Sequence, residues 1–140
     1  MERTFTIELK STYEESEKIP DFADDVGRET GMDEENTETF KLILSEAVTN
    51  AIIHGNRNDP KKKVSVSVNV TDEYVSADIQ DEGKGFDPSK KKKDPLKEEH
   101  LLDIGGRGVF LIEQFSDHME FKKNGTLLHF RIDFDDTLSK

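Results

Sequence analysis

Apolar and polar residues alternate along several stretches of the chain, which is the pattern of half-buried β-strands. Residues 4–9, 64–70, 118–122 and 127–134 show this alternation. Residues 74–80 show it too, and a turn short enough for a hairpin joins them to the second stretch. The sequence therefore predicts a sheet that is built mainly from hairpins, the last of them around an Asn-Gly turn at 124–125.

Between these strands, apolar residues recur every three or four positions, as they do on the buried face of a helix. The strongest such signal spans residues 33–54, and Gly55 is predicted to cap this helix. Residues 12–29 carry a weaker signal, in which a proline at position 20 marks either a helix start or a kink, and a glycine at 31 is predicted to end it. A third helix is predicted over residues 104–115.

The predicted elements follow one another as strand, helix, helix, strand, strand, loop, helix, strand, strand. Most connections are short turns rather than long crossovers, so the sheet is expected to be mixed or mainly antiparallel. The expected fold class is α+β, a two-layer sandwich whose sheet is covered on one face by three helices. Residues 1–140 show neither a repeat nor a linker and are expected to form one domain, with a charged loop over 88–99.

The 140 residues carry a formal net charge of −11, from 20 basic and 31 acidic side chains. Coulomb repulsion then opposes binding to nucleic acid or anionic lipid through the overall field. The absence of cysteine excludes disulfides and thiolate metal sites. No apolar stretch is long enough to span a bilayer or to resemble a signal peptide. A soluble, cytoplasmic protein without nucleic-acid or membrane partners is expected.

Glu46 and Asn50 stand one helical turn apart, at the edge of the apolar face of the long predicted helix. A carboxylate and an amide placed there cost desolvation free energy unless a partner satisfies them. They fit either a hydrogen-bonded boundary pair or a functional pair, in which a carboxylate base lies beside an oxygen ligand of Mg²⁺. His54, another turn along, is interpreted as a partly buried residue at the helix end.

The segment DEGKGFD follows directly after the strand predicted at residues 74–80. Asp81 is placed to accept a hydrogen bond from the exocyclic amine of a base, while Gly83 and Gly85 leave room for a flat ring. A surface turn with an aspartate cap is the alternative.

A third group of candidates opens the last predicted helix, in the segment DIGGRGVFLIEQF. Gly105, Gly106 and Gly108 precede a helix whose first N–H groups and dipole favour an anion such as a phosphate. Arg107 is placed to add a charge-assisted hydrogen bond. A glycine-rich helix start without a ligand is the alternative.

Taken in this order, the three groups resemble the motifs of a known family. EAVTNAIIHG at 46–55 resembles the N box of the GHKL (Bergerat-fold) ATPases, DEGKGFD resembles their G1 box, and GGRGVFLI their G2 box. Within that superfamily the chain is most similar to the stand-alone RsbW/SpoIIAB type of bacterial anti-sigma factor and serine kinase. The similarity extends over essentially the whole chain.

The resemblance implies a role for each candidate. Asn50 would coordinate Mg²⁺ that bridges the phosphates of ATP, and Glu46 would act as general base or orient the attacking hydroxyl. Asp81 would bind the adenine amino group, and residues 88–103 would form the ATP lid. Gly83 and Gly85 would shape the adenine pocket, and Arg107 would contact the γ-phosphate. The loop would close over the phosphates at Gly105, Gly106 and Gly108.

The resemblance also implies a function. The protein would hold a sigma factor inactive and would use Mg-ATP to phosphorylate a serine of an anti-anti-sigma (STAS-type) partner. A homodimer is expected on the same ground. The alternative is an ATP-regulated binding module that lacks significant kinase activity or acts on a target other than a sigma factor.

Overall fold

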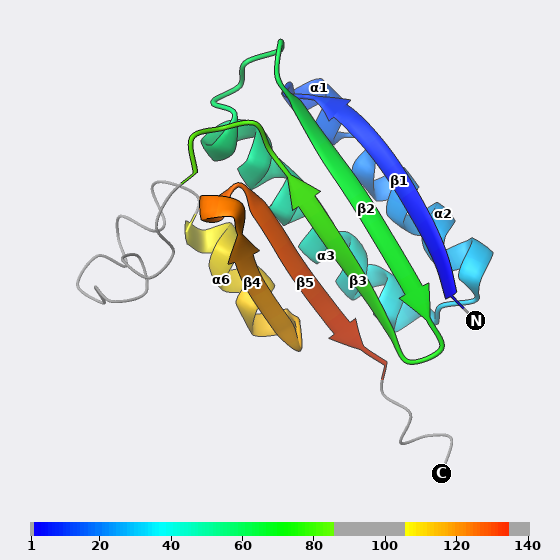
Figure 1. Ribbon diagram of the computed structural model, residues 1–140. Helices are drawn as coiled ribbons and strands as arrows, with labels where there is room; N and C mark the ends of the chain where they lie inside the picture. The colour runs from blue at the N-terminus through cyan, green and yellow to red at the C-terminus, as the bar shows by residue number, and fades with distance from the viewer. Residues whose placement is uncertain (1, 86–105, 135–140) are drawn as a thin grey trace.

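The computed structural model describes residues 2–85 and 106–134. They form a five-stranded sheet in the order β1-β2-β3-β5-β4, and every described pair of neighbouring strands is antiparallel. Helices cover one face of this sheet (Figure 1). The predicted α+β two-layer fold is confirmed.

The bounds of the elements follow the hydrophobic pattern closely. The strands are β1 (Glu2–Lys10), β2 (Lys63–Thr71), β3 (Tyr74–Gln80), β4 (His118–Lys122) and β5 (Leu127–Asp133). The helices are α1 (Tyr13–Ser16), α2 (Ile19–Thr30), α3 (Glu34–Asn50) and α6 (Gly106–Phe115). None of these described helices is both long and apolar enough to cross a membrane.

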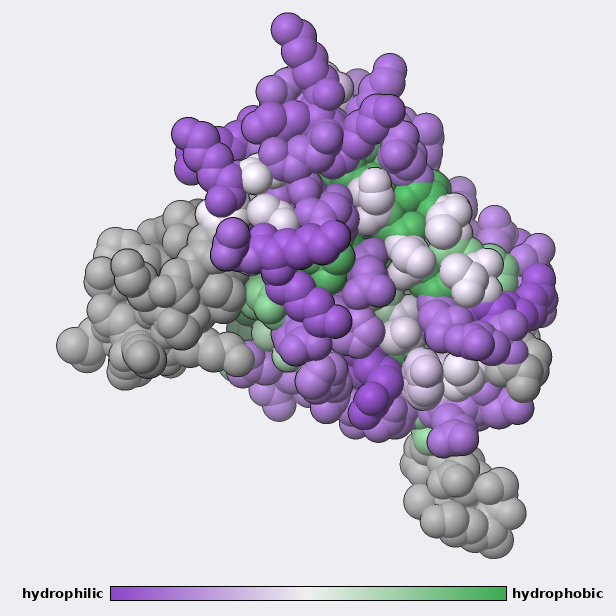
Figure 2. Space-filling view, viewed as in Figure 1, coloured by the Kyte–Doolittle hydropathy of each residue, from purple (hydrophilic) through white to green (hydrophobic). Residues whose placement is uncertain are grey.

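The apolar face of the sheet and the apolar faces of the helices enclose one core. In β2 the valines at 64, 66, 68 and 70 are buried, and the residues between them lie on the other face of the sheet. Phe40 of α3 packs against Phe130 of β5, with ring centroids 6.2 Å apart. The open side of the sheet is mostly hydrophilic, with smaller hydrophobic areas (Figure 2), and the burial of alternate residues in these strands marks the face that the helices cover.

The helix boundaries have clear local causes. Pro20 lies in the first turn of α2, so it starts this helix rather than kinking it. Gly31 ends α2 in the left-handed conformation, with φ of 75°. The side chain of Asp33 then caps α3 by accepting a hydrogen bond from the N–H of Asn36 at 2.7 Å.

The end of the long helix differs from the predicted cap at Gly55. After Asn50 the chain continues through a π-helical turn, η1 (Ala51–Gly55), and Asn56 is the C-cap. Ala51 and Ile52 are buried in this turn, as the pattern predicts for a continued α-helix, so their burial does not distinguish an α turn from a π turn. Such π turns are frequent at functional sites.

Asn56 is a buried polar residue that joins three segments at this end of the molecule. Its Nδ2 donates to the Ser11 hydroxyl at 2.6 Å and to the Lys63 carbonyl at 3.0 Å. Its Oδ1 accepts from the N–H of Glu82 at 2.7 Å. The start of β2, the end of β1 and the loop after β3 are therefore held together by one side chain.

Replacing Asn56 by Ala is expected to lower the free energy of unfolding by about 2–3 kcal/mol, because the buried Ser11 hydroxyl and two partly buried backbone groups lose their hydrogen-bond partner. Thermal and urea unfolding followed by circular dichroism measures this change. Asn69→Ala is the control, because the Asn69 amide lies in an exposed network on β2. A control loss as large as that of Asn56→Ala would contradict the structural role.

Candidate functional site

A cavity of about 340 Å³ opens where α3 passes into η1 and β3 ends. The loop after β3, the start of α6 and the turn between β4 and β5 complete its walls. Its apolar lining consists of Ala47, Ala51, Ile53, Ile79, Val109, Phe121 and Leu128. Such a cavity, with apolar walls and a few polar groups, has the character of a small-molecule site.

Asp81 lies in this cavity, directly after β3. Its N–H donates to the Thr126 carbonyl at 2.9 Å, and its Oδ1 accepts from the N–H of Gly83 at 2.8 Å. Burial raises the pKa of this half-buried carboxyl from its ordinary value of 3.8, and the Gly83 N–H and the charge of Lys62 oppose this increase. The carboxylate is thus a fixed hydrogen-bond acceptor in a partly desolvated place.

The glycines after Asp81 allow the loop to pack against the protein's own backbone. A Cβ on Gly83 would overlap with the Gly55 carbonyl, and a Cβ on Gly85 would overlap with the Asn124 carbonyl. Gly85 also has φ of 79°, which favours glycine. Close backbone approach therefore explains both glycines, whereas the sequence suggested room for a flat ring. Gly85 lines the cavity and Gly83 does not; their contacts with a base remain a prediction.

The side chains of Glu46 and Asn50 on α3 lie close to the start of α6. A Cβ on Gly108 would overlap with Nδ2 of Asn50 and would lie 3.1 Å from Oε2 of Glu46. Nδ2 of Asn50 is buried and has no hydrogen-bond partner among the described residues. Asn50 lines the cavity, while Glu46 lies one turn earlier and outside its lining. The boundary-pair alternative receives no support, because no described hydrogen bond joins the two side chains.

Some predicted residues lie outside the described part of the chain. Gly105 and the segment 88–103 are among them. Gly106 is the first residue of α6, and Arg107 follows it in the helix, but the position of the Arg107 side chain is not described. The phosphate contacts of these residues stay predictions.

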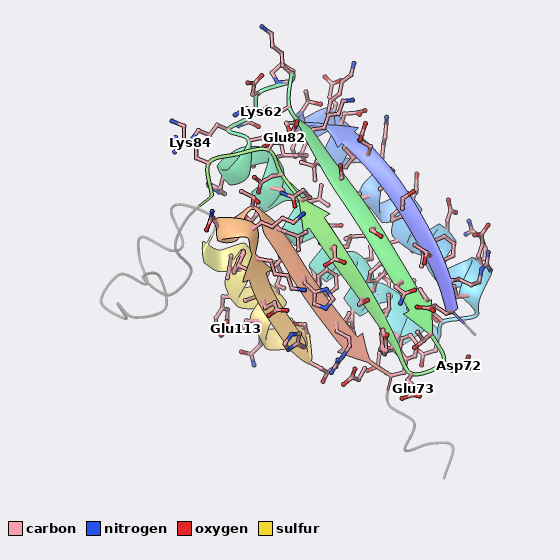
Figure 3. The ribbon with its side chains drawn as sticks, viewed as in Figure 1. Lys62, Asp72, Glu73, Glu82, Lys84 and Glu113 are labelled. Carbon is pink, nitrogen blue, oxygen red and sulfur yellow. The ribbon has the colours of Figure 1, made fainter. Side chains whose placement is uncertain are left out.

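The structure also places residues at the cavity that the sequence did not single out. Arg57, Lys84 and Thr126 line it. Figure 3 shows Lys62, Glu82 and Lys84 at one end of the sheet, with Asp72 and Glu73 at the other. The two cavity cations occur in polar loops, where nothing in the local sequence separates them from ordinary surface residues.

The comparison with known proteins agrees with this geometry. Residues 9–132 match the family described as histidine kinase-like ATPase domain, and the chain belongs to that family. The resemblance to the GHKL ATPases is thereby confirmed.

Several curated proteins similar to the chain are anti-sigma F factors. That of Geobacillus stearothermophilus is 43% identical over 81 residues, which is 57% of this chain and 56% of that protein. That of Oceanobacillus iheyensis is 39% identical over 82 residues, or 58% and 56% of the two chains. That of Bacillus cytotoxicus is 40% identical over 100 residues, or 69% and 68%. The matched region thus spans little more than half the length of the first two relatives.

Proposed function

We propose that this protein is an ATP-binding anti-sigma factor and a protein serine kinase. It holds a sigma factor inactive, and it uses Mg-ATP to phosphorylate a serine of an anti-anti-sigma (STAS-type) partner. The observation that supports nucleotide binding is the buried Nδ2 of Asn50, which has no hydrogen-bond partner among the described residues and lies in a cavity that the half-buried Asp81 also lines. The likeness to anti-sigma F factors supports the sigma-factor partner.

The cavity fits an adenine nucleotide by shape and polarity. Its apolar walls offer a surface for a flat ring, and the Asp81 carboxylate is an acceptor for a 6-amino group. Asn50 and the start of α6 lie together at another part of the wall, where the N–H groups and dipole of a helix favour phosphate. The cations Arg57 and Lys84 offset part of the protein's negative charge near the ligand.

Asn50 also fits a role as a ligand of Mg²⁺. Rotation about its Cβ–Cγ bond exchanges the two ends of the amide, and the nitrogen gives up no hydrogen bond in this rotation. The carbonyl oxygen is then available as a hard donor, which suits this ion. Within residues 2–85 and 106–134 no cluster of acidic or histidine side chains could hold a metal by itself, so phosphate and water oxygens would complete the coordination. Bound Mg²⁺ would neutralise charge on the phosphates.

Glu46 is the proposed general base. Its carboxylate has no described hydrogen-bond partner, and it lies beside the Gly108 backbone next to Asn50. As the serine oxygen of the partner attacks the γ-phosphorus and ADP leaves, Glu46 would accept the hydroxyl proton.

One observation favours a second candidate function, an ATP-regulated binding module without significant kinase activity. Glu46 does not line the cavity, so the geometry accounts for nucleotide binding without requiring transfer. Incubation with γ-labelled ATP and a serine-bearing partner separates the two functions, because only a kinase transfers the label. The homodimer is a further part of the proposal, and light scattering in solution tests it.

Titration calorimetry of the wild type and of Asn50→Ala tests the nucleotide site. The wild type is expected to bind ATP more tightly with Mg²⁺ than without it. Asn50→Ala is expected to lose roughly 10–100-fold in affinity with Mg²⁺, since an interaction with a charged group contributes about 1.5–3 kcal/mol.

The control for this titration is Asn36→Ala, at the other end of the same helix. It is expected to bind as the wild type does. An Asn50→Ala variant that kept the full effect of Mg²⁺ would exclude the ligand role, and a wild type that bound no ATP would refute the proposed function.

A further inference from the structure

Gln80, the last residue of β3, contacts both of the loops that form one wall of the cavity. Its Nε2 donates to the Asp81 carbonyl at 2.7 Å and to the Thr126 hydroxyl at 2.9 Å, and the Thr126 carbonyl lies 3.3 Å away. Gln80 itself does not line the cavity, whereas Asp81 and Thr126 do. Any effect of Gln80 on a ligand therefore acts through these two residues.

The orientation of the Gln80 amide is determined by its surroundings. Three oxygen acceptors gather at its nitrogen end, while its Oε1 is buried and has no partner among the described residues. A half-turn of the amide would place Oε1 against those three acceptors, which is unfavourable. A buried acceptor without a partner costs free energy. The hydrogen bonds of Nε2 must offset this cost, so they explain why the side chain lies in this place.

This orientation determines what the Thr126 hydroxyl offers to a ligand. A hydroxyl has one proton and two acceptor positions. The proton goes to the Lys123 carbonyl at 2.8 Å, and one acceptor position takes the hydrogen bond from Gln80. The position that remains is a lone pair. Asp81 and Thr126 both line the cavity, and the side chains of these two residues then have hydrogen-bond acceptors but no free donor.

We propose that Gln80 is a positioning residue for nucleotide selectivity. It holds the loop at 81–85 against the turn at 123–126, and it fixes the Thr126 hydroxyl as an acceptor. The wall then favours a purine with a 6-amino donor over one with a 6-oxo acceptor. This inference rests on the ATP binding proposed above.

Affinities for ATP and for inosine triphosphate, whose purine carries a 6-oxo group, provide the test. Both are measured in the presence of Mg²⁺ by calorimetry. In Gln80→Met, the preference for ATP is expected to fall about 10-fold, as for the loss of one hydrogen bond. Thr126→Val is expected to lower it to the same extent, and the double variant is expected to lower it no further, because the two residues act as one unit.

The control is Gln114→Met, the same chemical change at an exposed position of α6. A merely structural role of Gln80 would lower the melting temperature, or both affinities in parallel, and would leave their ratio unchanged.

The outcomes separate this inference from the proposed function. A wild type that binds neither nucleotide refutes the proposed function and this inference with it. A wild type that binds ATP, with an unchanged ratio in Gln80→Met, refutes only the role of Gln80. If Gln80→Met does not fold, Thr126→Val decides, and an unchanged ratio in that variant overturns the inference.

Discussion

Phosphoryl transfer is expected to slow by roughly 10²–10⁴-fold when Glu46 is replaced by Gln, the usual contribution of a general base. Nucleotide affinity is expected to stay nearly unchanged, because Glu46 lies outside the lining of the cavity. Glutamine keeps the shape of the side chain and removes its ability to accept a proton. Single-turnover transfer from γ-labelled ATP to the partner serine measures the rate, and calorimetry measures the affinity.

Glu38→Gln is the matched control for this prediction. Glu38 lies two turns earlier on α3, is exposed, and pairs with Lys41. This variant is expected to transfer phosphate at the wild-type rate. Normal transfer by Glu46→Gln would show that the base assignment is wrong, and a parallel loss of ATP affinity would assign Glu46 to binding instead.

Gly108→Ala is expected to weaken ATP binding by roughly 10–100-fold, since overpacking costs about 1–3 kcal/mol. The added Cβ would overlap with Nδ2 of Asn50 and approach the Glu46 carboxylate. Either Asn50 leaves its place in the cavity or the start of α6 moves away from α3. Both movements separate the groups that are proposed to bind the phosphates and Mg²⁺.

Gly27→Ala offers a matched control for this clash. A Cβ on Gly27 of α2 would collide with the Thr37 side chain of α3, at a helix contact whose residues do not line the cavity. Its melting temperature is expected to fall, as for Gly108→Ala, while its ATP affinity is retained. Equal affinity losses in the two variants would assign the Gly108 effect to general destabilisation.

Most of the fold could be predicted because each element carries its own signal. The valines of β2 alternate without interruption, so both the strand and its buried face follow from the pattern. Pro20, Gly31 and Asp33 act on the backbone within one turn, and the helix ends depend on such local contacts. The π-helical turn after Asn50 and the insertion of β5 between β3 and β4 depend on tertiary packing, and no short segment encodes them.

For the site, the sequence predicts which polar side chains lie at the cavity, but it does not predict the packing role of the glycines. The side-chain chemistry of Asn50 and Asp81 makes them candidate ligand-binding residues, and both line the cavity. The sequence predicts that Gly83 leaves space for a flat ring, but in the structure the Gly55 carbonyl lies against this glycine. That contact joins residues that are far apart in the chain. The proposed role of Gln80 and Thr126 depends on the hydrogen bond that joins β3 to the β4–β5 turn. No local sequence pattern predicts this contact.

Four apolar residues of the cavity wall, Ala47, Ala51, Ile79 and Leu128, also belong to the buried core. An adenine ring placed against them would complete the core at the point where it meets solvent. A ligand that binds only the native chain stabilises it by about 2.7 kcal/mol at 100 times its Kd. Resistance to heat and to proteases would then follow the nucleotide supply. The lifetime of the protein in a starved cell would then depend on nucleotide binding, even where no phosphate is transferred.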